Sequence, residues 1–343
     1  MNSPFVPTPP IPLCDLRGRL NPEAIGWSPQ PRVDCSLPGN LGRRKRWNHW
    51  NICTPDWTLS LIQADLDYVG YGAAYFLDLG SSHHAALNQL SLLARGCNLP
   101  DAPQGGHAFD HPRLQLHFNE FPGRVRLTAT SPNIGGQPLH LALDIQRPAH
   151  LESVNLVVPL ADKGFHASCR QVGLPVTGSV HLGARDYECT SGQSFASMDF
   201  GRGVWPLRSQ WKRAVFAAPG GIGGNFGSGW TEHSGLTENA LWFGGALLHL
   251  EQAVQIRQTR QSPLAPWQLY TEDGQVDLTF TPRHAHAAKP RLGLGLLYAD
   301  THEWFGQYDG LLRNALGERV PVRAAQGWIC LLYTSDAADD SLR

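Results

Sequence analysis

The densest group of residues with chemical capability lies between Asp199 and Asn239. This stretch holds three carboxylates, three tryptophans, the basic Arg202 and nine glycines. Carboxyl groups set among apolar walls are candidates for a raised pKa and for acid/base catalysis, and tryptophans build such walls. We therefore predict a pocket here whose candidate catalytic acids are Asp199, Glu232 and Glu238.

The same stretch supplies most of the predicted ligand contacts. Arg202 suits a carboxylate or phosphate group, because its guanidinium donates two parallel hydrogen bonds. The alternative for Arg202 is a structural ion pair with Asp199, three residues away. The predicted ligand-binding residues are Arg202, Trp205, Trp211, Asn225, Trp230 and Asn239, together with Trp47 and Trp50 of an earlier tryptophan cluster.

Each candidate also has a structural alternative. Glu238 would cap a turn or pair with a neighbouring strand, and Glu232 would be solvated. The two asparagines would satisfy loop backbone, since Asn beside Gly favours turns. His284 and His286 can share one face of a strand, but no third zinc ligand stands at a convincing spacing. We therefore predict no metal and no cofactor.

Several well-known catalytic signatures are missing from the sequence. Neither a GxSxG elbow nor a P-loop is present, and GGIGGNFG does not match GxGxxG. Esterase, kinase and dehydrogenase functions therefore lose their usual support. The reaction type that the sequence still supports is acid/base catalysis by carboxyl groups in a pocket that excludes water.

Composition excludes several classes of partner. The formal net charge is −1, which gives no broad electrostatic attraction for nucleic acid. No apolar run approaches the roughly 20 residues of a membrane-spanning helix, so we predict no integral membrane segment. The N-terminus lacks the pattern of a secretory signal, and the seven cysteines are scattered without a CxxC pair. Reduced thiols and a cytoplasmic location follow as expectations.

The order of elements predicts an all-β protein. Gly plus Pro reach 62 of 343 residues, and short alternating segments begin at Trp47. Residues 83–99 fit either a short helix or a strand with a loop, while Asp273-Gly274 is the strongest hairpin signal. Hairpins without βαβ alternation predict antiparallel sheets, whose edges are best removed by closure into barrels. We expect a proline-rich arm over residues 1–40 and barrel-like domains over 41–172 and 173–329.

The last residues, 330–343, read CLLYTSDAADDSLR and depart from this pattern. They resemble the translation of a sequencing adapter, so we predict a non-native tail. If so, the natural chain continues differently after Ile329.

Several tryptophan-containing words resemble a bacterial family, domain of unknown function 2804. These words are GRLNPEAIGWS, RRKRWNHW, ADLDYVGYGAAYFLD, LPVTGSVHLG, MDFGRGVWP, GGNFGSGWTEHSGLTENAL and VDLTFTP. The resemblance runs from about Leu13 to Trp328, with Glu232 standing where the family pattern has Asp. More distantly, the chain is similar to two-domain lipocalin-like proteins that include carotenoid hydratases and AttH proteins. That relation implies paired barrels and apolar ligands, but fold alone does not fix function.

Two main functions remain open from the sequence, besides a third interpretation as a structural or interaction module. The first is a cofactor-independent hydratase or isomerase that acts on a lipid or isoprenoid-like substrate by carboxylate acid/base chemistry. The second is a lipid-binding or carrier protein with the same cavity and no chemistry. An unpaired, desolvated carboxyl group facing the cavity would favour the enzyme.

Overall fold

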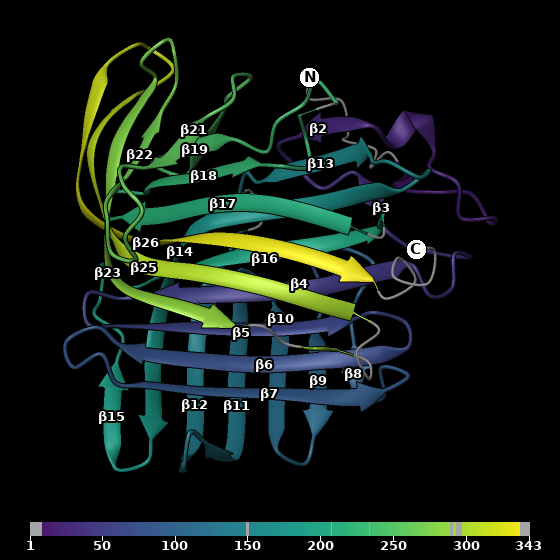
Figure 1. Ribbon diagram of the computed structural model, residues 1–343, viewed down its shortest axis with the longest axis horizontal. Coiled ribbons are helices and arrows are strands. Elements are labelled where there is room, and N and C mark those ends of the chain that lie inside the picture. Colours follow the sequence, from purple (N-terminus) through teal and green to yellow (C-terminus); the bar gives the residue numbers. More distant parts are fainter. Residues whose placement is uncertain are drawn as a thin grey trace, which may run out of the picture.

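Strands make up nearly all of the regular structure (Figure 1). The computed structural model describes residues 9–148, 151–206, 208–232, 234–288, 291–292 and 297–336. Within these ranges the strands form two large, curled antiparallel sheets, together with one short 3-10 helix, η1 (Pro22–Ala24), and a small parallel pair, β1 (Ile11–Pro12) and β3 (Val33–Asp34). The all-β prediction of two lipocalin-like units is confirmed.

The first large sheet contains fourteen strands. Its main path runs β7-β6-β5-β4-β16-β14-β12-β11-β10-β9-β8, with β2, β13 and β15 attached at the side. The bounds are β2 (Gly26–Ser28), β4 (Arg44–Cys53), β5 (Trp57–Asp65), β6 (Val69–Asp78), β7 (His84–Leu92), β8 (Cys97–Asn98), β9 (His107–His111), β10 (Leu114–Phe121), β11 (Arg124–Ile134), β12 (Gln137–Gln146), β13 (Val154–Pro159), β14 (Phe165–Leu182), β15 (Arg185–Glu188) and β16 (Phe195–Val204).

The long strand β14 makes this sheet curl. Its first part pairs with β13 and β16, and its last part pairs with β12 and β15. The register with β16 shifts between Gln171 and Leu174, where Gly173 has a φ of 75°. Such a bulge bends a strand and increases its twist. In Figure 1, β9–β12 consequently cross behind β5–β7, and a common core fills the space between them.

The second large sheet contains ten strands in the order β20-β19-β18-β17-β26-β25-β23-β22-β21, with β24 paired to β25. The bounds are β17 (Arg208–Ala218), β18 (Ile222–Ser228), β19 (Ala240–Phe243), β20 (Ala246–His249), β21 (Gln255–Gln258), β22 (Trp267–Tyr270), β23 (Val276–Ala288), β24 (Arg291–Leu292), β25 (Leu297–Arg313) and β26 (Arg319–Asp336). The predicted Asp273-Gly274 turn joins β22 to β23, and Gly274 has a φ of 68°.

The change from the first sheet to the second falls between the end of β16 at Val204 and the start of β17 at Arg208. The predicted boundary between residues 172 and 173 lies inside β14. Residues 83–99, left open between helix and strand, form β7 and β8. Residues 330–336 of the predicted tail continue β26, and 337–343 lie outside the described residues. The domain limits themselves stay predictions.

A separate apolar cluster joins the two large sheets. It includes Tyr75 and Val172 of the first sheet and Val215, Phe305 and Trp328 of the second. Each sheet also has its own core on its other face. Since strands alternate their side chains between faces, strands such as β25 serve both the interface and their own core. No described helix has the length and apolar composition needed to span a bilayer.

Candidate functional site

Tryptophan rings gather where the two sheets meet. The rings of Trp47 on β4 and Trp211 on β17 are nearly parallel, at 10°, with centroids 6.5 Å apart. Trp205, in the connection after β16, stands edge-on to both, and His166 stacks on Trp47 at 5.0 Å. Gly201 permits this arrangement, because a Cβ there would lie 2.1 Å from Cζ2 of Trp47.

Four charged side chains cross the same interface. Arg170 on β14 and Asp199 on β16 come from the first sheet, while Arg213 on β17 and Glu238, before β19, come from the second. Asp199 accepts hydrogen bonds from Nη1 of both arginines, and Nε of Arg170 donates to Oε2 of Glu238 at 2.7 Å. All four are ion-paired. Two positive and two negative charges therefore balance, as buried charges require.

Indole N–H groups complete this quartet. Trp47 donates Nε1 to Oδ1 of Asp199, and Trp230 donates Nε1 to Oε1 of Glu238, both at 2.9 Å. Burial opposes the ionisation of Glu238, but the charges of Arg170 and Arg213 outweigh burial and lower its pKa. Glu238 is thus held as a carboxylate rather than as a proton donor.

The first cavity lies beside these groups and has a volume of about 490 Å³. Its walls are mainly aromatic and apolar, with the charged quartet on one side. The lining residues are Trp47, Pro159, Leu160, Ala161, His166, Arg170, Asp199, Trp205, Pro206, Arg208, Ser209, Gln210, Trp211, Arg213, Gly229, Trp230, Ser234 and Glu238. A volume of this size suits a small organic ligand.

The second cavity has a volume of about 360 Å³ and lies between β4–β7 and β23–β26. Alanines line much of it, and small side chains leave the space that larger ones would fill. The lining residues are Lys45, Trp47, His49, Ser60, Ile62, Ala64, Leu66, Tyr71, Ala73, Ala74, Tyr75, Ala86, Asn88, Asp199, Trp205, Trp211, Arg213, His286, Ala288, Ala299, Thr301, Glu303, Trp328, Cys330, Leu332 and Thr334.

Glu303 is the unusual group of the second cavity. It lies on β25 opposite His286 of β23 and Cys330 of β26. Among the described residues its carboxyl group has no hydrogen bond and no ion pair, and it faces the cavity. Burial raises the pKa of Glu303 to about 7, because desolvation disfavours the charged form. Near neutral pH this group can therefore both hold and release a proton.

Three other titratable groups around the second cavity, His49, Tyr71 and Tyr75, are neutral near pH 7. Burial, with the charges of Arg213 and Arg170, lowers the pKa of His49 to about 3. Its Nε2 lies 2.7 Å from Oγ of Ser60. Burial also raises the pKa of Tyr71 and of Tyr75 well above the ordinary value of a phenol. Among Glu303, His49 and the two tyrosines, only Glu303 has a pKa near physiological pH.

The structure brings together six of the residues predicted from the sequence. Trp47, Trp205, Trp211, Trp230, Asp199 and Glu238 all line the first cavity. Glu232 is exposed, and its Oε1 accepts a hydrogen bond from the backbone of Gly229 at 2.5 Å. The other four, Trp50, Arg202, Asn225 and Asn239, line neither of these two cavities.

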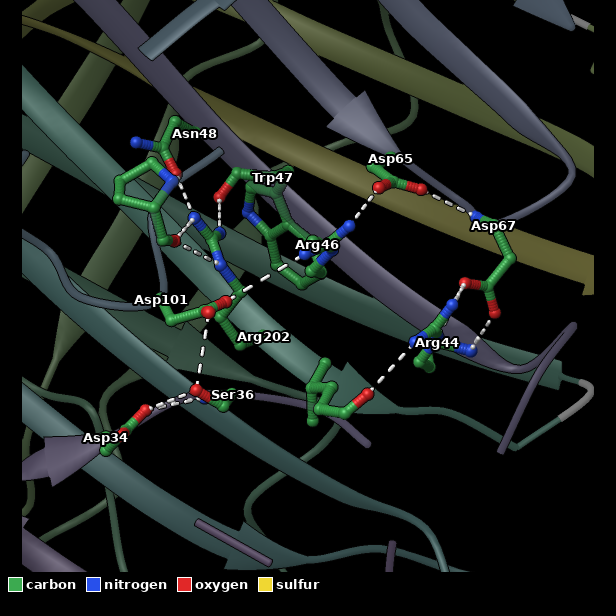
Figure 2. A network of polar contacts seen from close by, with 12 residues as sticks. Asp34, Ser36, Arg44, Arg46, Trp47, Asn48, Asp65, Asp67, Asp101 and Arg202 are labelled. Carbon is green, nitrogen blue, oxygen red and sulfur yellow. Dashed lines mark hydrogen bonds and ion pairs between the residues drawn. The ribbon is translucent and has the colours of Figure 1, made fainter. Parts of the chain in front are cut away.

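Arg202 lies outside both cavities and donates hydrogen bonds to backbone carbonyls (Figure 2). The expected ion pair with Asp199 is wrong, because residues three apart on a strand point to opposite faces. The guanidinium is fully buried and donates to the carbonyls of Pro100 and Trp47 and to Oδ1 of Asn48. These contacts tie the loop before β9 to β4 and β16.

Two of the basic residues near Trp47 are also paired (Figure 2). Arg44 pairs with Asp67 at 2.5 Å, and Arg46 pairs with Asp65. Oδ1 of Asp65 also accepts from the backbone N–H of Asp67, which shapes the turn between β5 and β6. These basic residues near Trp47 therefore take part in structural ion pairs.

The other predicted contact residues outside the two cavities also make hydrogen bonds within the protein. Trp50 is buried in the first core and donates Nε1 to His107 at 3.3 Å. Asn225 accepts from Nε of Arg213 at 2.8 Å and donates to the carbonyl of Glu238. Asn239 accepts from the backbone N–H of Gly227 at 2.8 Å. Both asparagines hold the Glu238 segment in place beside the first cavity.

Sequence reasoning missed Glu303, His49 and the alanine-lined wall. The segments YGAAYF and HHAALN, on the adjacent strands β6 and β7, and HAHAA on β23 indicated this wall, because small residues repeat in all three. His284 and His286 lie near His84, with ring centroids 5.8 Å and 6.4 Å away. Within the described part of the chain, no three His, Cys, Asp or Glu side chains form a group that could hold a metal ion.

Two solved structures are similar to this chain over most of its length. Kievitone hydratase from Nectria haematococca is similar with a TM-score of 0.54 and 11% identity, over 85% of this chain and 89% of that one. A protein assigned as AttH from Nitrosomonas europaea has a TM-score of 0.49 and 11% identity, over 84% and 92%. No curated protein matches the sequence.

The first likeness shows a shared fold. The family model for the domain of unknown function 2804 matches residues 6–331, which include both cavities except Leu332 and Thr334. The chain therefore belongs to the family described as domain of unknown function 2804.

Proposed function

We propose that the protein binds an apolar ligand and acts on it as a cofactor-independent hydratase or isomerase, with Glu303 as the proton donor. The observation that carries the proposal is the Glu303 carboxyl group, which faces the second cavity without a partner among the described residues. With a pKa of about 7, a large fraction of this carboxyl group carries its proton near neutral pH. An acid of this kind is most effective when its pKa lies near the working pH.

The chemistry is a proton transfer to carbon. In hydration, the Glu303 carboxyl group protonates one alkene carbon, water bonds to the neighbouring carbon, and the excess proton of that water returns to Glu303. In isomerisation, Glu303 protonates one alkene carbon, which leaves the positive charge on the other alkene carbon. The resulting carboxylate then removes a proton from the next carbon along the chain, so the double bond moves by one position. Both routes leave Glu303 protonated, so neither consumes a co-reactant other than water.

Aromatic faces would stabilise the positive charge that develops. Tyr71, Tyr75 and Trp328 line the same cavity as Glu303, and the negative face of an aromatic ring attracts a cation. Arg213 also lines it, but Asp199 compensates the charge of this arginine. These groups all precede Cys330, but Cys330, Leu332 and Thr334 of the predicted tail form part of the cavity wall beside Glu303.

The carboxylates predicted from the sequence suit this role less well. Asp199 and Glu238 are ion-paired with arginine, and such a pairing favours the charged form. Glu232 is exposed, which leaves it without the apolar surroundings that raise a carboxyl pKa. Their catalytic role stays a prediction, and substitution by the amide tests it at each position.

The shared fold with a hydratase is compatible with the proposal, although fold does not fix a reaction. The test begins with the protein purified from its host. Co-purified small molecules would be extracted and identified by mass spectrometry, then incubated with the wild-type protein, Glu303→Gln and the exposed control Glu272→Gln. We expect conversion by the wild type and the control, and a loss of about 100-fold or more in Glu303→Gln, the scale of general acid catalysis.

The same experiment separates the carrier alternative. A bound molecule that the wild type does not convert would identify a binding protein. Equal conversion by Glu303→Gln and the wild type would remove Glu303 from the mechanism.

A further inference from the structure

The two cavities share part of their lining. Five residues face both of them: Trp47, Asp199, Trp205, Trp211 and Arg213. Side chains from β4, β16, β17 and the connection after β16 therefore form the boundary between the cavities. A boundary made of side chains can admit a ligand where a strand would not, since hydrogen-bonded backbone cannot be displaced locally without loss of pairing.

We infer that the first and second cavities are two parts of one site, which takes an elongated molecule lying across the tryptophan boundary. The inference rests on the proposed function and adds to it the ligand class and the position of the reacting bond. Each cavity alone falls within the size range of small-molecule sites. A molecule longer than either cavity would use the apolar surface of both.

The charge distribution gives the ligand its orientation. At the boundary, Arg213 is compensated by Asp199, so the middle of the ligand meets no net charge from this pair. The first cavity also includes the exposed polar residues Arg208 and Gln210. The second cavity has six alanines in its lining, against one in the first, although polar residues such as Lys45, Asn88 and Thr301 also line it.

These surroundings place a polar end of the ligand in the first cavity and an apolar end in the second. The ligand class is thus a long-chain or isoprenoid-like amphiphile with a neutral middle. Glu303 then acts near the apolar end, away from the polar group. The reaction would alter a bond in the tail rather than one next to the head.

Primary alkanols test this geometry without any reaction. Wild-type affinity for the series from 1-hexanol to 1-dodecanol would be measured by titration calorimetry. If the cavities are one site, affinity keeps rising by up to about fourfold per methylene along the series, with one alkanol bound per protein. A plateau at a length that fills one cavity, or two dodecanol molecules per protein, overturns the inference.

Plugging each cavity separately gives the second test. Ala161 lines only the first cavity and is exposed, while Ala73 lines only the second. Ala161→Phe and Ala73→Phe should each weaken 1-dodecanol binding by about 10-fold or more, because each displaces several methylene groups. 1-Hexanol, held by its hydroxyl end in the first cavity, should lose affinity in Ala161→Phe only.

The outcomes separate the two proposals. If only one of the two phenylalanine variants weakens 1-dodecanol binding, the cavities are independent and the single site is overturned. This conclusion holds whatever effect Glu303→Gln has on turnover. Conversely, weaker 1-dodecanol binding by both variants supports the single site, even if Glu303→Gln converts the substrate normally. The wild-type alkanol series supports or overturns the inference without relying on a folded variant.

Discussion

Nε of Arg170 donates a hydrogen bond of 2.7 Å to Oε2 of Glu238, and the two side chains are only 4% and 1% exposed. Arg170 belongs to the first sheet and Glu238 to a segment of the second. The bond therefore fastens the two halves at the wall of the first cavity.

Removing the charge of Glu238 should destabilise the protein strongly. Glu238→Gln leaves two buried arginines with Asp199 as their only compensating carboxylate in the quartet, and breaking a buried pair costs about 3–5 kcal/mol. Urea unfolding would measure the loss. The exposed pair Arg19–Asp15 supplies the control, because exposed ion pairs contribute little and Asp15→Asn should leave the free energy of unfolding nearly unchanged. Equal, small losses in both variants would show that the quartet does not fasten the sheets.

The stability of the wild type should depend on pH through Glu303. Burial raises the pKa of Glu303 from 4.5 to about 7, so the folded protein keeps a proton that the unfolded chain has released. Stability is then lost as pH rises through this window. Glu303→Gln has no proton to lose and should be more stable than the wild type above pH 7 by about 1–3 kcal/mol.

Denaturant unfolding at a series of pH values measures this difference. The variant and the wild type should converge below pH 4.5, where the carboxyl group is protonated in both states. Glu272→Gln, at an exposed position, should follow the wild type throughout. A constant difference between Glu303→Gln and the wild type at every pH would contradict the shifted pKa.

A methyl group at Gly201 should disturb the tryptophan boundary. The Cβ of Gly201→Ala would lie 2.1 Å from Cζ2 of Trp47, so the indole has to move and its hydrogen bond to Asp199 is lost. Overpacking of this kind costs about 1–3 kcal/mol. Thermal unfolding and alkanol binding should both weaken. Gly80→Ala, whose Cβ would lie 3.4 Å from Oδ1 of Asp78, should change neither, and normal dodecanol binding by Gly201→Ala would contradict the placement of Trp47.

Glu232→Gln should have little effect. Glu232 is exposed, and the hydrogen bond from Gly229 can be accepted by an amide oxygen as well. We expect the variant to convert the co-purified ligand as the wild type does. Its free energy of unfolding should match the wild type within about 0.5 kcal/mol, as for most surface substitutions. A loss of turnover without a loss of stability would instead establish Glu232 as part of the catalytic machinery.

The sequence predicted the fold well because local patterns decide it. Alternation such as Trp57, Leu59 and Leu61 identifies strands, and Asp273-Gly274 identifies a hairpin. It also found the tryptophan cluster, since the words around Trp47, Trp205 and Trp211 are rich in aromatic residues and glycine. Local spacing does not, however, report which residues of two sheets meet.

That limitation explains the incorrect Asp199–Arg202 pair. The partners of Asp199 are Arg170 and Arg213, which lie 29 and 14 positions away in the sequence. Glu303 was missed for the same reason. Its strand carries aromatic residues on both faces, Trp304 on one and Phe305 on the other, so alternation alone does not show which face borders a cavity.

The protonation state of Glu303 is the most direct test of the central claim, that a neutral carboxyl group faces an apolar cavity. Infrared difference spectra between the wild type and Glu303→Gln would be recorded as pH is raised through 7. We predict a carbonyl band of a protonated carboxyl group, absent from the variant, that disappears with a midpoint near 7. A midpoint near the ordinary value of 4.5 would contradict the account.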